Sequence, residues 1–93
     1  MFARVATYTG EADELVRGFE TARSDLEQID GFSQAYFCVD RASGKGLTIT
    51  LWESEQALER SAEQAQQLRA RATEPSGATI DSVQRYEVAI TVP

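Results

Sequence analysis

Residues 31–58 read GFSQAYFCVDRASGKGLTITLWESEQAL, and this stretch decides the fold. Residues 32–40 and 47–53 are rich in β-branched and aromatic types, which is typical of strands. The small and flexible residues at 41–46 suit a hairpin connection between them. The sequence therefore predicts two antiparallel strands, followed by a helix that begins after the natural N-cap Ser54.

The flanking segments continue the alternation of strands and helices. Residues 2–9 (FARVATYT) predict a strand that stops at Gly10, and apolar residues at spacings of three and four predict a helix at about 11–29. The apolar stripe of the second helix is made mostly of small residues: Leu58, Ser61, Ala62, Ala65, Leu68 and Ala72. Residues 73–78 (TEPSGA) break this helix, and alternation over 79–92 predicts a long last strand.

The order β-α-β-β-α-β predicts an α+β, ferredoxin-like fold, in which a four-stranded antiparallel sheet carries both helices on one face. Apolar residues nevertheless occupy both faces of the predicted strands. On the second strand, one face takes Phe32, Tyr36 and Cys38, and the other takes Ala35, Phe37 and Val39. On the first strand, Phe2, Ala6 and Tyr8 lie on one face, and Ala3 and Val5 lie on the other. We therefore expect a second copy to cover the bare face, with the last strand as an arm that reaches the partner.

Length and charge narrow the classes of protein. Ninety-three residues predict one domain, residues 1–93, and 42% hydrophobic with 26% charged residues is an ordinary globular composition. The net charge of −6 arises mainly in residues 1–31 and leaves no basic stripe, so we expect neither nucleic acid nor an anionic membrane as a partner. The N-terminal residues lack the pattern of a signal peptide, and we expect a cytoplasmic protein.

The missing residue types exclude several chemistries. The chain has no His, no Asn and a single cysteine, Cys38, which argues against an internal disulfide, the usual zinc sites, Ser-His-Asp or Cys-His catalysis and imidazole-ligated haem. The glycine-containing turn at 41–46 joins two strands and opens no helix, so it is not a phosphate loop. We expect no haem, flavin or transition metal, and we expect Cys38 to be a buried, inert thiol.

Three features of residues 31–58 recur in a known family: a Gly-aromatic start, a hairpin with a small-residue turn, and a strand that ends in Trp-x-Ser before the second helix. On these features the chain resembles the antibiotic biosynthesis monooxygenase (ABM-like) family of dimeric α/β barrels, and the resemblance continues to VQRYEVAI at 83–90. It implies a homodimer of facing sheets, with a pocket between sheet and helices in each subunit. Some members resemble cofactor-free oxygenases of polycyclic phenols. Others degrade haem with an Asn and a His, residue types that this chain lacks.

The phenol-oxidising branch is described as using Tyr, Trp, Arg and Asn around an apolar pocket. The resemblance thus implies Arg85, Arg4 and Tyr86 as catalytic candidates, the arginines stabilising a phenolate. The substrate-binding candidates are Trp52, Tyr36, Tyr8 and Phe37.

Each candidate also has a structural interpretation. Trp52 is a natural packing anchor, the tyrosines suit a core or an interface, and the arginines suit ion pairs with Glu87 or Glu53. Two functions therefore stay open: a cofactor-independent monooxygenase of a small aromatic or polyketide-like compound, and a non-catalytic homodimer that binds a small molecule or serves as a scaffold.

Overall fold

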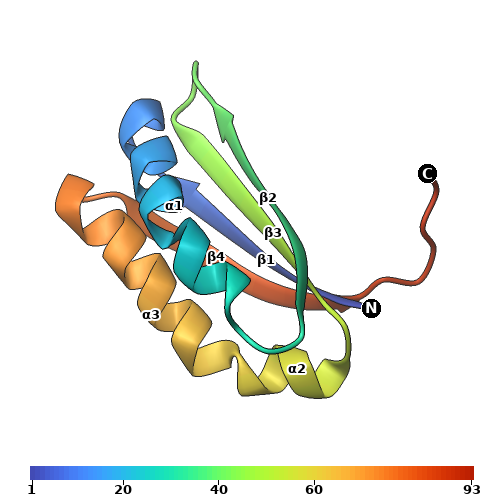
Figure 1. Cartoon of the computed structure of the whole chain (residues 1–93). Helices are drawn as coiled ribbons and strands as arrows, with labels where there is room; N and C mark the ends of the chain where they lie inside the picture. Colours follow the sequence, from blue (N-terminus) through green and yellow to red (C-terminus); the bar gives the residue numbers. More distant parts are fainter.

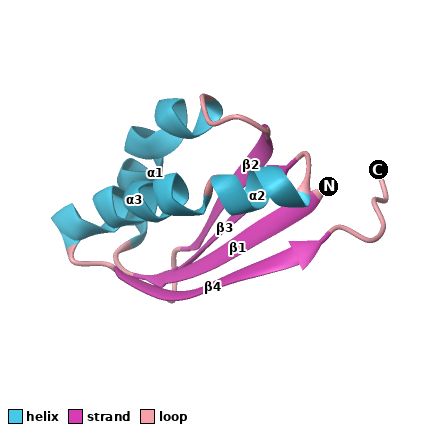
Figure 2. Cartoon of the chain, turned by 90° about the horizontal axis from the view of Figure 1, so that it is seen from below, coloured by secondary structure: helices cyan, strands magenta, loops and turns pink.

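The computed structural model describes all 93 residues. Its elements are β1 (Phe2–Thr9), α1 (Ala12–Glu27), β2 (Phe32–Asp40), β3 (Lys45–Trp52), α2 (Glu55–Arg60), α3 (Ala62–Thr73), a 3-10 turn at Glu74–Ser76, and β4 (Thr79–Glu87). The strands form one antiparallel sheet in the order β2-β3-β1-β4 (Figure 1). Figure 2 shows all the helices on one face of this sheet, which confirms the predicted ferredoxin-like class. None of the helices combines the length and hydropathy needed to cross a membrane.

The second predicted helix is divided in two at Ser61. The carbonyl oxygen of Leu58 accepts hydrogen bonds from Arg4 Nη2 at 2.6 Å and from Ser61 Oγ at 2.8 Å. In a continuous helix the same carbonyl would accept the backbone N–H of Ala62. Two side-chain donors thus compete with the backbone at the point where α2 ends and α3 begins, and one of them comes from the sheet below.

The last strand is shorter than the alternation of residues 79–92 indicates. β4 lies at the edge of the sheet with β1 as its one neighbour, and β1 begins at Phe2, which pairs with Glu87. One more hydrogen bond follows, from Val88 N to Met1 O at 3.0 Å. The prediction of a strand to residue 92 is wrong, because the pairing of β4 with β1 ends here and residues 89–93 lead away from the sheet (Figure 1).

The predicted faces of β1 and β2 are confirmed apart from Phe32. That residue pairs with Trp52, but Gln34 already pairs with Leu51, so a β-bulge between them reverses the alternation. Phe32 therefore faces the helices, where its ring centroid lies 5.7 Å from that of Trp52. Cys38 lies on the open face and is exposed, so the expectation of a buried thiol is wrong for the single chain.

Two apolar clusters fill the space between sheet and helices. One contains Ala6, Tyr8, Leu15, Phe19 and Ala72, and the other contains Leu26, Trp52, Ala57, Leu58 and Leu68. Trp52 is fully buried, which fits the packing anchor. The helices α1 and α3 approach closely at Gly18, where a Cβ atom would lie 2.1 Å from the carbonyl oxygen of Ala72.

Candidate functional site

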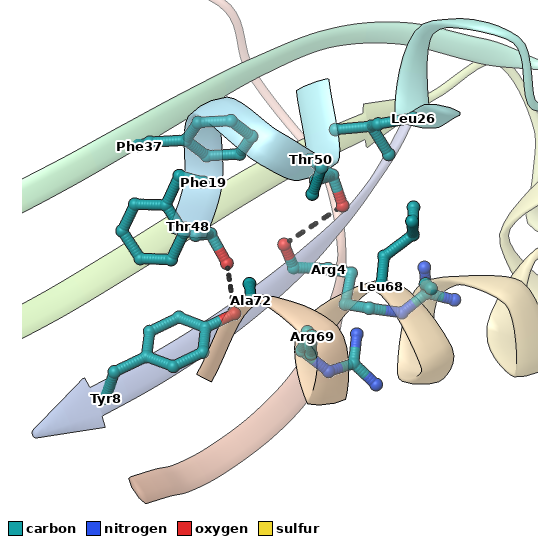
Figure 3. A pocket seen from close by; sticks show the side chains of 12 residues that line it. Arg4, Tyr8, Phe19, Leu26, Phe37, Thr48, Thr50, Leu68, Arg69 and Ala72 are labelled. Carbon is teal, nitrogen blue, oxygen red and sulfur yellow. Dashed lines mark hydrogen bonds between the residues drawn. The ribbon is translucent and has the colours of Figure 1, made fainter. Parts of the chain in front are cut away.

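A pocket lies between α1, α3 and the helix-facing side of the sheet, at the boundary of the two apolar clusters (Figure 3). Eight of its twelve lining residues are hydrophobic, and the full set is Arg4, Tyr8, Phe19, Ala22, Leu26, Phe37, Thr48, Thr50, Ala65, Leu68, Arg69 and Ala72. The empty space is about 460 Å³ with the mouth included, of which about 50 Å³ can hold the centre of a water molecule. Apolar walls with a few polar groups are the usual composition of a small-molecule site.

Arg4, on β1, is a buried guanidinium whose hydrogen-bond partners are neutral. Nη1 donates to Ser61 Oγ at 3.2 Å and Nη2 donates to the carbonyl of Leu58 at 2.6 Å. The guanidinium carbon also lies 5.5 Å from the centroid of the Trp52 ring, within the range of a cation–π contact. The positive charge of Arg4 is thus stabilised by the dipoles of its two hydrogen-bond partners and by the face of the Trp52 ring.

Burial, followed by the charges of Arg69 and Arg85, lowers the pKa of Arg4 to about 10. The side chain is therefore still a cation at neutral pH. The predicted ion pairs with Glu87 or Glu53 are wrong for both arginines.

Arg85 lies at the outer end of the same row of the sheet, opposite Arg4 in the pairing of β1 with β4. Its guanidinium reaches α2, where Nη2 lies 3.3 Å from Glu59 Oε1 and 4.0 Å from Glu55 Oε2. Because these carboxylates come from the helix above the strand, strand alternation alone could not have found them. The Arg85 side chain is outside the pocket and more than half exposed.

Tyr8 is the buried hydroxyl of the pocket. Its ring packs edge-on against Phe19 with the centroids 5.3 Å apart, and its hydroxyl lies 3.2 Å from Thr48 Oγ1. Burial raises the pKa of Tyr8, although the hydrogen bond with Thr48 and the charge of Arg69 oppose the shift. At neutral pH the phenol is therefore protonated and can donate a hydrogen bond.

Arg69, on α3, lines the pocket and was not among the predicted site residues. It is partly buried, and this burial lowers its pKa, while the Tyr8 hydroxyl acts in the opposite direction. No carboxylate oxygen lies within 4.0 Å of it. The sequence did contain a signal, because Arg69 follows Ala65 by four residues and so lies on the small-residue face of the helix.

Apart from Arg85, the predicted site residues separate into two groups. Arg4, Tyr8 and Phe37 line the pocket, and Trp52 is buried behind Arg4. Tyr36 and Tyr86 lie on the open face of the sheet, each 51% exposed, and their hydroxyls bond to Gln34 and Gln84 on the same strands. A common site in one chain therefore contains three of the seven candidates, with Arg69, Thr48 and Thr50 as further polar members.

Residues 1–73 match the antibiotic biosynthesis monooxygenase family. The chain belongs to this family. Two uncharacterized proteins of Mycobacterium tuberculosis strain H37Rv are related to it. One is 33% identical over 70 residues, covering 71% of this chain and 31% of the relative. The other is 32% identical over 83 residues, covering 84% of this chain and 35% of the relative. The chain thus spans about a third of the length of the curated relatives it matches.

Solved structures of other proteins share the fold. The structure of SnoaB, a cofactor-independent oxygenase from Streptomyces nogalater, superposes with a TM-score of 0.77 at 20% identity, covering 99% of this chain and 96% of that one. The heme-degrader MhuD from Mycobacterium tuberculosis, solved with two hemes bound, gives a TM-score of 0.76 at 21% identity, with all of both chains covered.

The residues of this pocket do not fit haem. Haem iron is held by His, Cys, Met or Tyr side chains. The chain has no His, and Cys38 lies on the opposite face of the sheet from the pocket. The Tyr8 hydroxyl is engaged with Thr48, and only about 50 Å³ of the whole pocket can hold the centre of a water molecule. No group of three or more His, Cys, Asp or Glu side chains is arranged to hold a metal ion.

Proposed function

We propose that this chain is a cofactor-independent monooxygenase that oxidises a small phenolic or polyketide-like compound with dioxygen. The observation that carries the proposal is the composition of the pocket: apolar walls, the unpaired guanidinium groups of Arg4 and Arg69, and the protonated hydroxyl of Tyr8. Membership of the family and the shared fold of SnoaB support it.

The reaction needs no cofactor if the protein stabilises a substrate anion. An electron-rich phenolate or enolate reduces dioxygen itself, and a ring CH₂ becomes C=O while the second oxygen atom leaves as water. Arg4 and Arg69 place positive charge beside the ionised oxygen in an apolar pocket, where charges are screened less than in water. Tyr8 adds a hydrogen-bond donor to the same oxygen.

The pocket contains no general base, because neither a carboxylate nor an imidazole lines it. The substrate proton therefore leaves through water at the mouth, and the two cations act by making the substrate more acidic. Binding also requires the pocket to widen. Phe37 lies on the edge strand β2 and is 37% exposed, so its side chain has room to rotate toward solvent and open the pocket.

We also propose a homodimer that forms through the open face of the sheet. Leu47, Ile49 and Leu51 of β3 form a half-buried apolar row there, with Tyr36 and Tyr86 exposed beside it. An apolar sheet face of this kind normally has a cover.

Oxygen uptake with anthrone-like and naphthol-like compounds tests the enzyme function. We expect uptake by the wild type, unchanged by a chelator and without a Soret or flavin band in the protein spectrum. Arg69→Gln and Tyr8→Phe should each lower kcat/KM, by about 10²-fold or more for the arginine. Arg71→Gln is the matched control, since Arg71 lies on the same helix but pairs with Asp25 outside the pocket. Arg4→Gln is measured too, with circular dichroism to confirm that it folds.

Arg85→Gln and Tyr86→Phe test the remaining catalytic candidates, which lie outside the pocket of their own chain. A large loss of activity in these variants would move the site to the open face or the dimer interface. No uptake with any compound, from folded wild-type protein, would favour the non-catalytic homodimer instead.

A further inference from the structure

The core between the sheet and the helices has a gap where its two apolar clusters meet. The lining of this gap includes Thr48 and Thr50 from β3 and the methyl groups of Ala22 and Ala65 from α1 and α3. Atoms that line a void lose dispersion contacts on one side, so protein cores normally close such spaces with larger side chains. The pocket is thus a space that the packing of this chain leaves open.

The size of this space admits a small molecule and excludes a ring. About 50 Å³ of the pocket can hold the centre of a water molecule. One water needs about 10 to 15 Å³ by this measure, whereas an apolar cavity that takes up benzene has about 150 Å³. The pocket therefore has room for a molecule of about two or three heavy atoms, and an aromatic substrate enters only after the pocket has widened.

Few hydrogen bonds are open to water in this space. The Tyr8 hydroxyl lies 3.2 Å from Thr48 Oγ1, Thr50 Oγ1 accepts a hydrogen bond from Trp52 Nε1 at 2.9 Å, and Arg4 donates to its two neutral partners. No buried side-chain nitrogen or oxygen of the chain lacks a hydrogen-bond partner. An ordered water needs about two to four polar partners, and apolar cavities without them stay dry and take up apolar molecules. The space therefore favours an apolar occupant over water.

Three residues border the mouth of the pocket. All the lining residues are buried except Ala22, Phe37 and Arg69. The inner walls include Leu26 and Leu68, which belong to one apolar cluster. Figure 3 shows these two leucines apart from the ring of Phe37. A small apolar molecule against the leucines therefore lies away from the side at which an aromatic ring would enter.

We infer that the pocket takes up dioxygen before the aromatic substrate enters, and that its buried apolar walls hold the gas by dispersion alone. This inference rests on the proposed function and deepens it, because it names where the second substrate resides. Dioxygen is diatomic, apolar and needs no hydrogen bond, so it fits both the size and the lining of the space. The same properties admit other apolar gases, and xenon therefore serves as a probe.

The first test uses the paramagnetism of dioxygen, which speeds the relaxation of nearby protons in NMR. Methyl groups of the wild type are compared in solutions equilibrated with dioxygen and with dinitrogen. We expect the largest increase in relaxation rate at the inner walls, at Ala65, Leu26 and Leu68. The matched controls are Leu15 and Leu58, which are at least as buried but lie outside the pocket. If relaxation rises no more at the pocket methyls than at these controls, the inference is overturned.

The second test fills the space. Ala65→Val replaces a methyl group of the inner wall with an isopropyl group, and we expect this variant to lose the excess relaxation at Leu26 and Leu68 together with the shift of the xenon NMR line. Ala62→Val should keep both signals, since Ala62 is exposed on the same helix. Circular dichroism checks the fold, and Ala22→Val fills the space from α1 if Ala65→Val does not fold. Unchanged gas signals in a folded filling variant would contradict the inference.

Neither measurement depends on turnover. Gas binding in the pocket without oxygen uptake in the activity assay would contradict the proposed oxygenase and leave this inference standing. Oxygen uptake by a protein whose pocket methyls respond like the controls would do the reverse.

Discussion

Replacing Gly18 with alanine should destabilise the protein by forcing α1 and α3 apart. The added Cβ would lie 2.1 Å from the carbonyl oxygen and 2.9 Å from the carbonyl carbon of Ala72. Both atoms belong to the backbone of α3, so no side chain can turn away to relieve the contact. The helices must separate by roughly 1 Å before the atoms reach ordinary van der Waals spacing.

Two terms of opposite sign set the magnitude. Overpacking against a rigid backbone costs up to about 3 kcal/mol. Alanine favours the helical conformation over glycine by about 1 kcal/mol. The net expectation is a loss of about 2 kcal/mol, which for a domain of this size corresponds to a fall in Tm of about 8 to 16 °C.

Thermal unfolding followed by circular dichroism and by the fluorescence of Trp52 measures this change. Trp52 is the one tryptophan and is fully buried, so its emission reports the core beneath α2 and α3. The exposed pair Ser24→Ala and Ser24→Gly on α1 measures helix propensity alone. All proteins are compared at one concentration, because association shifts Tm. If Gly18→Ala proves as stable as the wild type, the close approach of the two helices is refuted.

Three further expectations concern the same elements. Burial raises the pKa of Tyr8, so the neutral side chain stabilises the fold fully below about pH 10, and this contribution is lost as pH rises through the raised pKa. In urea titrations at alkaline pH, the wild type should therefore lose stability relative to Tyr8→Phe. Ser61→Ala removes a buried hydrogen-bond partner and should lower the free energy of unfolding by about 1 to 3 kcal/mol. Sedimentation at micromolar concentration should show a wild-type dimer, a folded Tyr36→Asp monomer and a Phe37→Asp variant with a disrupted fold; a monomeric wild type contradicts the proposed assembly.

The order of strands and helices was predictable because hydrophobic period depends on local sequence. The face on which Phe32 lies was not predictable, since a single β-bulge reverses the alternation and the residue types around it do not reveal its position. The end of β4 was set by where β1 begins, which is a property of the pairing and not of residues 88–92 themselves.

Of the candidates that the resemblance implied, Arg4, Tyr8 and Phe37 line the pocket, whereas Tyr36 and Tyr86, which alternate equally well, lie on the open face. Distinguishing the helix-covered face from the open one required the packing of the helices. Arg69 was overlooked because arginines on helices are mostly surface residues, and its lack of an acidic neighbour is visible only in three dimensions.

The contrast between an acidic exterior and a carboxylate-free pocket has a kinetic consequence. A compound that is already ionised in solution is repelled by the net charge of −6 as it approaches, whereas a neutral phenol is not. Entry as the neutral acid and ionisation inside the pocket therefore form the faster route. Added salt should speed the association of 2-naphthoate and leave that of 2-naphthol almost unchanged, because screening acts on the approach of the anion alone. Under the proposed function, the form of the ligand that crosses the mouth and the form that reacts then differ by one proton.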